Sequence, residues 1–283
     1  MNLPDFYVDE IIKTALKEDI SYIDVTTDLL VDSMHHSKAF FLSKADGVIS
    51  GLAVALRVFE ILDSGVKTKT AFIDGDPVKK GDVIAEFHGK TAALLKGERT
   101  SLNFLQHMSG ISTYTAKCVS LVAGTKASIA DTRKTLPGLR TLQKYAVATG
   151  GGRNHRYNLS DAAMIKDNHI DAYNGITNAV KELRKKAGHL VNIEIEVRDL
   201  YEMKEAIAAG VKIIMLDNMP IDQMRKAVDI AEKLTAGQAI LEASGNITEE
   251  NIREIAKTGV DIISLGALTH SVKAFDVSMI WQK

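Results

Sequence analysis

VNIEIEVRDLYEMKEAIAAGVKIIMLD, residues 191–217, contains two strand patterns separated by one helix-length segment. Apolar residues alternate with glutamates in the first pattern, and VKIIML is a short run rich in β-branched residues. Residues 200–209 have the apolar spacing of an amphipathic helix, and Gly210 follows as a common helix stop. Two strands joined by a helix of this length predict a βαβ unit, which belongs to a parallel sheet.

The same pattern continues on both sides of this stretch. Four more strand patterns are KASIA at 126–130, AAMIK at 162–166, QAILEAS at 238–244 and VDIISLG at 260–266. Helix-length segments lie at 173–187, 221–234 and 248–258. A closed eight-unit barrel needs about 250 residues. We therefore expect an incomplete α/β barrel, with a doubly wound open sheet as the alternative.

Polar residues at the strand ends favour the barrel. Each of the six strand patterns ends with, or is followed by, one charged or hydroxyl residue, namely Asp131, Lys166, Glu196, Asp217, Ser244 and Ser264. The carboxyl ends of parallel strands meet at one rim, where α/β barrels build their active sites. We expect a site at this rim.

The N-terminal part has a different pattern, which predicts an α+β domain over residues 1–115 before a barrel domain over residues 116–283. It contains an amphipathic helix at 6–17 and strands at 39–42 and 67–73. Turn residues between apolar alternations at 73–89 predict tight β-hairpins. A long helix from about 92 to 122 would link the two domains, with a break near Ser109 and Gly110.

Charge is balanced over the whole chain but concentrated in one segment. The 283 residues contain 35 Lys and Arg against 36 Asp and Glu, which indicates neither a nucleic-acid coat nor a polybasic membrane patch. No apolar run is long enough to span a bilayer. Residues 131–170 nevertheless hold seven Lys or Arg against three acids. Such clustering predicts a site for a small, densely charged anion, such as a phosphate or carboxylate.

Two further features predict where the protein works. Cys118 is the single cysteine, so no disulfide can form within the chain. The N-terminal sequence MNLPDFYVDE lacks the basic start and apolar core of a signal peptide. Both favour a reducing cytoplasm.

The basic segment contains the candidate ligands for the anion. Arg133 and Lys134 follow the first barrel strand, and three glycines at 150–152 precede the triplet Asn154, His155, Arg156. Glycines let the backbone approach a ligand closely, although three in a row also commonly end a helix. An Arg fork can hold a carboxylate or phosphate bidentately. A solvated loop is the alternative for Arg133 and Lys134.

Carboxylates and serines complete the rim. Strand alternation places Glu194 and Glu196 on one face, and Asp217 ends the next strand. Beside a phosphorylated substrate, Glu196 and Asp217 are candidates for holding Mg²⁺ largely through substrate oxygens, whereas salt bridges are an equal alternative for Glu194. Ser244–Gly245 and Ser264–Gly266 follow the last two strands and lead toward helix N-termini, where phosphate binds well.

The motifs together resemble the quinolinate phosphoribosyltransferase family over nearly the whole chain. They include ALKEDISYIDVTTDLL, DGDPVKKGDVI, GERTSLNFLQHMSGIST and DTRKTLPGLRTLQKYAVATGGGRNHRYNLSDAAMIKDNH, followed by IEIEV, IMLDNM, LEASGNI and ISLGALTH. Met164 stands where an aliphatic residue is usual. The resemblance implies an N-terminal α/β domain, an incomplete barrel, and a homodimer or higher homo-oligomer with shared active sites.

The resemblance also implies a reaction. Quinolinate would attack the anomeric carbon of phosphoribosyl pyrophosphate, and pyrophosphate and carbon dioxide would leave, giving nicotinate mononucleotide in NAD biosynthesis. The implied quinolinate pocket contains Arg133, His155, Arg156 and Lys166, with Lys134 between the two substrates. Glu196 and Asp217 would face the ribose and Mg²⁺, and Lys134 and Lys166 would act with them in catalysis. The implied phosphate-binding residues are Ser244, Gly245, Gly266 and His270, and Arg99 would reach quinolinate from the partner subunit.

Three alternatives remain open. A paralogous phosphoribosyltransferase could use nicotinate or another aromatic acid as its acceptor. A Schiff-base aldolase could use Lys166, because such lysines also stand at strand ends. A carrier module could present Lys79 or Lys80 at a hairpin tip for modification.

Overall fold

The computed structural model describes residues 3–282, which form two compact units. One unit contains the described residues up to Ala116, together with Thr135–Gly151 and the segment from Leu268 onward. The other unit consists of Lys117–Lys134 and Gly152–Ala267. The predicted sequence domains, 1–115 and 116–283, differ from these units because two segments from the C-terminal half of the chain pack with the N-terminal residues.

The second unit is built on a six-stranded parallel sheet. Its strand order is β6-β11-β10-β9-β8-β7, and each neighbouring pair runs in parallel. The strands are β6 (Ser128–Ala130), β7 (Ala163–Ile165), β8 (Ile193–Val197), β9 (Ile213–Asp217), β10 (Ile240–Ser244) and β11 (Ile262–Ser264). All six lie within the predicted strand segments. From β7 to β11 the strands follow one another in space as in sequence, as in an α/β barrel.

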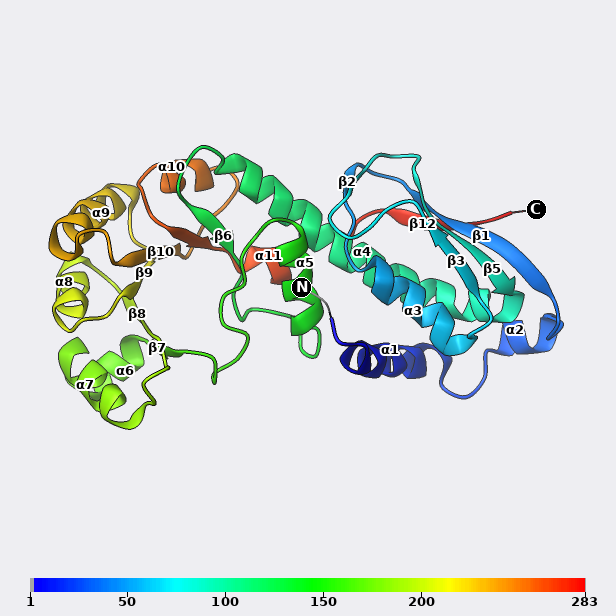
Figure 1. Ribbon diagram of the computed structural model, residues 1–283, viewed down its shortest axis with the longest axis horizontal. Coiled ribbons are helices and arrows are strands. Elements are labelled where there is room, and N and C mark those ends of the chain that lie inside the picture. Colours follow the sequence, from blue (N-terminus) through cyan, green and yellow to red (C-terminus); the bar gives the residue numbers. More distant parts are fainter. Residues whose placement is uncertain (1–2, 283) are drawn as a thin grey trace. The chain divides into compact units, whose positions relative to one another are not determined.

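Helices cover the outer side of this sheet (Figure 1). They are α6 (Asp167–Ala172), α7 (Ile176–Lys186), α8 (Leu200–Ala208), α9 (Ile221–Thr235) and α10 (Ile252–Ala256). Each buries its apolar stripe, such as Met203 and Ala206 in α8. The predicted helix at 173–187 is shortened by a turn at Asn174 and Gly175, which both adopt positive φ. The predicted helix at 248–258 is reduced to its five central residues.

The barrel is incomplete, as predicted. Strands β6 and β7 stand at opposite ends of the strand order and are not paired. The chain between them, residues 131–162, leaves the sheet to form α5 (Arg140–Thr149) within the other unit. It returns at Arg153, where an isolated parallel bridge forms with Ala130 of β6. The long basic segment of the sequence is therefore divided between the two units.

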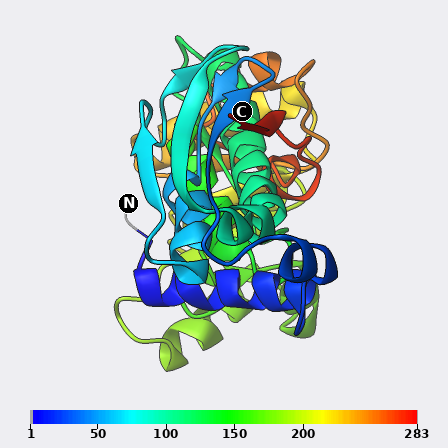
Figure 2. The ribbon, with the colours of Figure 1, turned by 90° about the vertical axis from the view of Figure 1, so that its right-hand side faces the viewer.

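The first unit contains an antiparallel sheet of order β12-β1-β5-β3, consistent with the predicted α+β class. Its strands are β1 (His36–Ser43), β3 (Lys67–Thr70), β5 (Val83–Lys90) and β12 (Val277–Trp281), and β2 (Gly47–Val48) pairs with β4 (Pro77–Val78). Its helices are α1 (Asp5–Ile20), α2 (Val25–Leu30), α3 (Leu52–Leu62), α4 (Thr91–Leu121), α5 and α11 (Ala267–His270). Figure 2 shows these strands lying alongside α4.

The core of this unit lies between the sheet and helices α3 and α4. Phe41 and Phe87 from the sheet meet Phe59 from α3, with ring centroids 4.6 to 6.2 Å apart. Leu94 and Leu105 of α4 are fully buried in the same cluster. Burial of this apolar area stabilises the unit and fixes α4 against the sheet.

Two predictions for this unit are wrong. Helix α4 is continuous through Ser109 and Gly110. A Cβ at Gly110 would lie 2.3 Å from the carbonyl oxygen of Lys273, so this glycine allows close packing against another segment instead of breaking the helix. The segment 73–89 forms no tight hairpin, because β4 pairs with β2 while β5 pairs with β1 and β3. Within residues 3–282, no helix is both long and apolar enough to cross a membrane.

Candidate active site

The carboxyl ends of the six parallel strands form one rim. Ser244 at the end of β10 pairs with Asp217 at the end of β9. Ser264 of β11 pairs with Ala130, the residue before Asp131. Glu196 lies one residue before the end of β8, and Lys166 follows β7 directly. The register therefore brings the polar strand-end residues to one edge of the sheet.

A pocket of about 430 Å³ opens at this rim. Eight of the residues that the family resemblance assigns to the site line it, namely Arg133, Lys134, His155, Arg156, Lys166, Glu196, Asp217 and Ser244. The remaining lining residues are Thr132, Met164, Met215, Glu242 and Ser264. Gly245 directly follows Ser244, and Gly266 lies two residues beyond Ser264. The structure thus brings cations and carboxylates from distant sequence positions together around one cavity.

Arg156 belongs to the cationic wall of the pocket, which consists of Arg133, Lys134, Arg156 and Lys166. Its Nη1 donates to the carbonyl oxygen of Ala162 at 2.8 Å, and its Nη2 lies 3.6 Å from the sulfur of Met164. Burial, and after it the positive charge of Arg133, lower the pKa of Arg156. Two partly buried guanidinium groups that repel each other favour the binding of an anion.

The acidic wall of the pocket consists of Glu196 on β8 and Asp217 on β9. Lys166 Nζ donates to Glu196 Oε2 at 2.6 Å, so these two predicted residues are paired across the mouth of the pocket. Asp217 Oδ2 accepts a hydrogen bond of 3.0 Å from the side chain of Asn218. Opposite charges from β7, β8 and β9 are therefore arranged in sequence order along the rim.

Asp131 has a structural task that its rim position alone does not predict. It is fully buried. Its Oδ2 accepts from the Asn154 side chain at 2.7 Å, and its Oδ1 accepts from the backbone N–H of His155 at 2.8 Å. Asp131 thereby ties the returning loop to the end of β6, which places His155 and Arg156 in the pocket.

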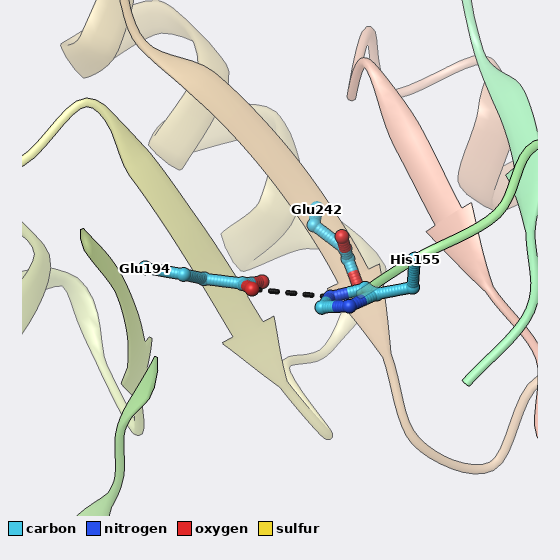
Figure 3. A group of neighbouring side chains, drawn as sticks. All are labelled: His155, Glu194 and Glu242. Atoms are coloured by element: carbon cyan, nitrogen blue, oxygen red, sulfur yellow. Dashed lines mark ion pairs between the residues drawn. The ribbon is translucent and has the colours of Figure 1, made fainter. Parts of the chain in front are cut away.

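His155 and Glu242, which line the pocket, form a buried cluster with Glu194. His155 Nε2 is 3.1 Å from Glu194 Oε2 and 3.6 Å from Glu242 Oε1. Figure 3 shows both carboxylates, from β8 and β10, pointing toward the imidazole ring. Burial, followed by the negative charge of Glu194, raises the pKa of Glu242 to about 7 against the opposing influence of His155. The partner of Glu194 is thus a histidine, whereas the salt-bridge alternative expected a Lys or Arg of the rim.

Glu242 was missed by the sequence reasoning. A signal existed in ILEAS, residues 240–244, because strand alternation places Glu242 on the same face as Ser244. A glutamate in an otherwise apolar strand is costly to bury, and this cost indicates a specific partner. The partner, His155, comes from a loop much earlier in the chain.

The two serine motifs differ in their local structure. Gly266 is followed directly by α11, as predicted, although this helix has only four residues. After Ser244 and Gly245, a turn extends to Asn251 before α10 begins. Gly245 has φ +91°, and a Cβ there would lie 2.2 Å from Asn218 Oδ1. The glycine is required because the turn passes so close to the residue after Asp217.

Two predicted residues lie in the other unit. Arg99 is an exposed residue of α4, and His270 is an exposed residue at the end of α11. His270 Nδ1 contacts the hydroxyl of Ser271 at 2.6 Å. Neither residue lines the pocket of the barrel unit. Their predicted roles therefore stay predictions.

Comparison with protein families covers both parts of the chain. The C-terminal domain of quinolinate phosphoribosyl transferase matches residues 111–280, and its N-terminal domain matches residues 24–109. The chain belongs to this family. The sequence-based family assignment and the predicted α/β fold with an incomplete barrel are both confirmed.

Relatives of this chain come from bacteria, plants and archaea. It is 47% identical over 262 residues to the probable nicotinate-nucleotide pyrophosphorylase [carboxylating] of Bacillus subtilis, covering 93% of this chain and 89% of that one. It is 43% identical to the chloroplastic nicotinate-nucleotide pyrophosphorylase [carboxylating] of Arabidopsis thaliana, with 98% and 83% covered.

Solved structures agree with these relatives. NadC from Streptococcus pyogenes matches with a TM-score of 0.94 and 41% identity, covering the whole of both chains. Human nicotinic acid phosphoribosyltransferase shares the fold with a TM-score of 0.62 at 10% identity, covering 99% of this chain and 74% of that one. At this level of identity the similarity concerns the fold alone.

Proposed function

We propose that this protein transfers the phosphoribosyl group of phosphoribosyl pyrophosphate to quinolinate, with release of carbon dioxide and pyrophosphate. The product, nicotinate mononucleotide, is a precursor of NAD. One observation carries the proposal, which is the convergence of Arg133, Arg156 and Lys166 on a single pocket opposite Glu196 and Asp217. Family membership supports the choice of substrates.

Quinolinate matches the cationic wall by charge. It carries two adjacent carboxylates, so its binding requires several cations in a partly desolvated cavity. Arg133 and Arg156 can each hold a carboxylate with two parallel N–H donors, while Lys134 and Lys166 supply compact charges. The mutual repulsion of the two guanidinium groups is relieved when a dianion lies between them.

The sugar matches the acidic wall. Departure of pyrophosphate leaves positive character on the anomeric carbon, which a carboxylate of Glu196 or Asp217 stabilises electrostatically. The attacking ring nitrogen has a free electron pair, so the transfer needs no general base. The nitrogen becomes cationic on transfer, and the adjacent carboxylate then leaves as carbon dioxide because the cationic nitrogen stabilises the electron pair left on the ring carbon. That carbon takes up a proton from solvent to give the product.

The ion pair between Lys166 and Glu196 connects the two walls. Without substrates these side chains neutralise each other at 2.6 Å. A bound diacid offers Lys166 a new carboxylate, which leaves Glu196 available to the ribose. Lys134, which lines the same pocket, is proposed to lie between the two substrates.

Mg²⁺ is proposed as the cofactor, with Glu196 and Asp217 as the residues that would hold it. Both carboxylates are on the pocket wall, and two oxygen donors fit a cation that takes its other ligands from phosphate and water. When bound, the ion would neutralise charge on the leaving pyrophosphate. Ser244, Gly245, Gly266 and His270 are proposed to bind phosphate.

A homodimer or higher homo-oligomer with shared sites is also part of the proposal. Helix α2 and its flanks leave Tyr22, Leu29 and Leu30 between 76% and 93% exposed, a concentration of large apolar side chains that suits a subunit interface. Exposed Arg99 would then enter the pocket of a partner subunit. A cytoplasmic location is likewise proposed, and it agrees with the single buried thiol of Cys118.

The test is a coupled assay of the purified protein with quinolinate, phosphoribosyl pyrophosphate and Mg²⁺. We expect carbon dioxide and pyrophosphate to appear in equal amounts, and no product when quinolinate is omitted. Nicotinate replaces quinolinate in a parallel reaction. Turnover of nicotinate without turnover of quinolinate would assign the protein to the paralogous activity.

The other two alternatives have less support. A Schiff-base lysine needs a neutral amine, whereas the ammonium of Lys166 is held by the carboxylate of Glu196. Borohydride trapping of a carbonyl compound on Lys166 would revive that alternative. Lys79 pairs with Asp46 at 3.3 Å, and Lys79 and Lys80 follow a strand that belongs to no tight hairpin. An intact mass without an acyl adduct would dispose of the carrier alternative.

A further inference from the structure

The two ring nitrogens of His155 have partners that determine the position of its hydrogen. The backbone N–H of Arg156 donates to Nδ1 at 2.8 Å. A backbone amide can only donate, so Nδ1 must be the unprotonated nitrogen. Nε2 then carries the hydrogen and donates it to Glu194 Oε2 at 3.1 Å. The contacts of the ring therefore favour the tautomer with its hydrogen on Nε2.

This tautomer argues against a metal in the buried cluster. The potential ligand atoms of His155, Glu194 and Glu242 lie within 4.8 Å of one another, close enough for one ion. A metal would need the electron pair of Nε2, and a histidine that binds metal through Nε2 normally donates a hydrogen bond from Nδ1. Here Nδ1 accepts one instead. The cluster is arranged around a hydrogen on Nε2.

We propose that Glu194 and Glu242 are positioning residues that hold the ring of His155 in place beneath the loop carrying Arg156. The inference deepens the proposed function and rests on it for the identity of the ligand. Both glutamates are at most 5% exposed. Glu194 is the direct acceptor, and Glu242 Oε1 lies farther away, 3.6 Å from Nε2 of the ring. Glu194 and Glu242 act through His155 and touch no reacting atom.

The cost of these two glutamates supports a functional role. Within residues 3–282, the Oε1 atoms of Glu194 and Glu242 have no hydrogen bond of good geometry, although Ser264 lies close enough to Glu242 to lower its pKa. Buried acceptors without partners are rare and destabilising, so two of them side by side would not be retained for stability alone. Such local costs are expected where a site must be held rigidly.

The loop is thus fixed from two directions. Asp131 holds the backbone of His155 from the end of β6, and Glu194 holds its ring from β8. The ring in turn accepts a hydrogen bond from the backbone N–H of Arg156, which fixes the backbone position from which the Arg156 side chain extends. The charge that binds the diacid then comes from the arginines and lysines, and His155 contributes shape and position.

The first test reads the tautomer directly and needs no substrate. The probe is the wild-type protein with ¹⁵N-labelled histidine at pH 7, and the His155→Asn variant identifies the His155 signals. We expect Nε2 to be protonated and Nδ1 to be unprotonated. A hydrogen on Nδ1, or on both nitrogens, would overturn the proposal. So would stoichiometric binding of added Zn²⁺ that shifts the His155 signals.

The second test separates positioning from a general effect on folding. Glu194→Leu removes the acceptor, and we expect the KM for quinolinate to rise by about tenfold or more, as losing a buried partner does, with the KM for phosphoribosyl pyrophosphate unchanged. Glu194→Gln keeps an acceptor oxygen and should remain near wild type. Glu242→Leu should have the smaller effect of the two leucine variants, because Glu242 is farther from Nε2.

The matched control is Glu202→Leu, which removes another buried glutamate of the same unit that pairs with Arg198 and lies outside the pocket. It should leave both KM values unchanged. An unchanged quinolinate KM in Glu194→Leu, or an equal rise for both substrates, would overturn the proposal. If Glu194→Leu does not fold, the histidine spectrum still decides. If the wild-type protein does not use quinolinate, the proposed function fails while the spectrum still tests the cluster.

Discussion

Arg156 illustrates how one side chain can be poorly stabilised alone and well stabilised with its ligand. Its guanidinium group is partly buried beside Arg133, and both effects lower its pKa. Its hydrogen bonds to the carbonyl of Ala162 and the sulfur of Met164 satisfy only part of its donor capacity. The guanidinium group therefore has donor capacity left for an incoming carboxylate.

The Arg156→Ala variant should bind quinolinate more weakly. Loss of two charge-assisted hydrogen bonds predicts a rise in the quinolinate KM of about 10- to 100-fold, with little change in the KM for phosphoribosyl pyrophosphate. The melting temperature without ligand should stay level or rise, because a repelling charge is removed. Arg153→Ala is the control, since Arg153 is an exposed residue of the same loop outside the pocket. Unchanged quinolinate binding in Arg156→Ala would contradict the assignment.

Glu242 predicts a dependence of stability on pH. Its pKa is about 7 in the folded protein against a usual value of 4.5. The folded state therefore binds more protons than the unfolded state between these values. The contribution of this group to the free energy of unfolding is fully present below pH 4.5 and is lost as the pH rises through 7.

A Glu242→Gln variant removes this titration. Its stability relative to wild type should increase from pH 5 to pH 8, reaching on the order of 1–3 kcal/mol at the higher pH. Thermal unfolding of both proteins at several pH values measures the difference. Glu86→Gln, at an exposed position of β5, should show no such trend. A Glu242→Gln variant that becomes relatively less stable at pH 8 would contradict the raised pKa.

The turn after β10 shows how a connection between elements positions a rim carboxylate. Asn218 donates to Asp217 and accepts from the side chain of Asn246, so the loops after β9 and β10 are joined. Gly245 lies directly against Asn218 with positive φ. Any side chain at position 245 would separate these loops and add backbone strain.

Gly245→Ala should therefore impair the sugar side of the pocket more than the diacid side. We expect a loss of stability of about 1 kcal/mol from the positive φ, together with a higher KM for phosphoribosyl pyrophosphate. Gly188→Ala is the control, because a Cβ there meets open space and its φ is ordinary. Melting temperatures and KM values for both substrates distinguish the two variants. A larger effect on quinolinate than on phosphoribosyl pyrophosphate would count against the predicted role of this turn.

The proposed oligomer makes a prediction about the assembled molecule. If Arg99 acts in the pocket of a partner subunit, Arg99→Ala and Lys166→Ala should each have little activity alone. Mixing and reassociating the two variants creates sites that combine an intact barrel with an intact Arg99, and about a quarter of the wild-type activity should return in a randomly mixed dimer.

The outcome separates a shared site from an independent one. If Arg99 serves its own chain, every mixed dimer keeps two defective sites and no activity returns. A mixture of Lys166→Ala with Glu196→Ala is the control, because both positions belong to the same pocket of one chain. Recovered activity in that control would show exchange of barrel segments instead of a shared Arg99.

Much of the architecture follows from local patterns along the chain. The six barrel strands, the incomplete closure and the polar residues at strand ends are set by apolar periodicity, turn residues and the length of the repeating unit. Parallel strands place their carboxyl ends at one edge whatever the intervening segments do. The family could be identified from the sequence because the motifs at that edge are continuous stretches of the chain.

The tertiary structure alone decided the rest, because the deciding contacts join residues far apart in the chain. Gly110 does not interrupt α4 but allows the backbone of Lys273 to pack closely against this helix. Strand β4 pairs with β2 instead of with the strand that follows it. In the same way Glu242 becomes significant only when folding brings it to His155. Sequence periodicity reports which side of an element is buried, whereas the identity of the neighbour on that side depends on how all the elements pack together.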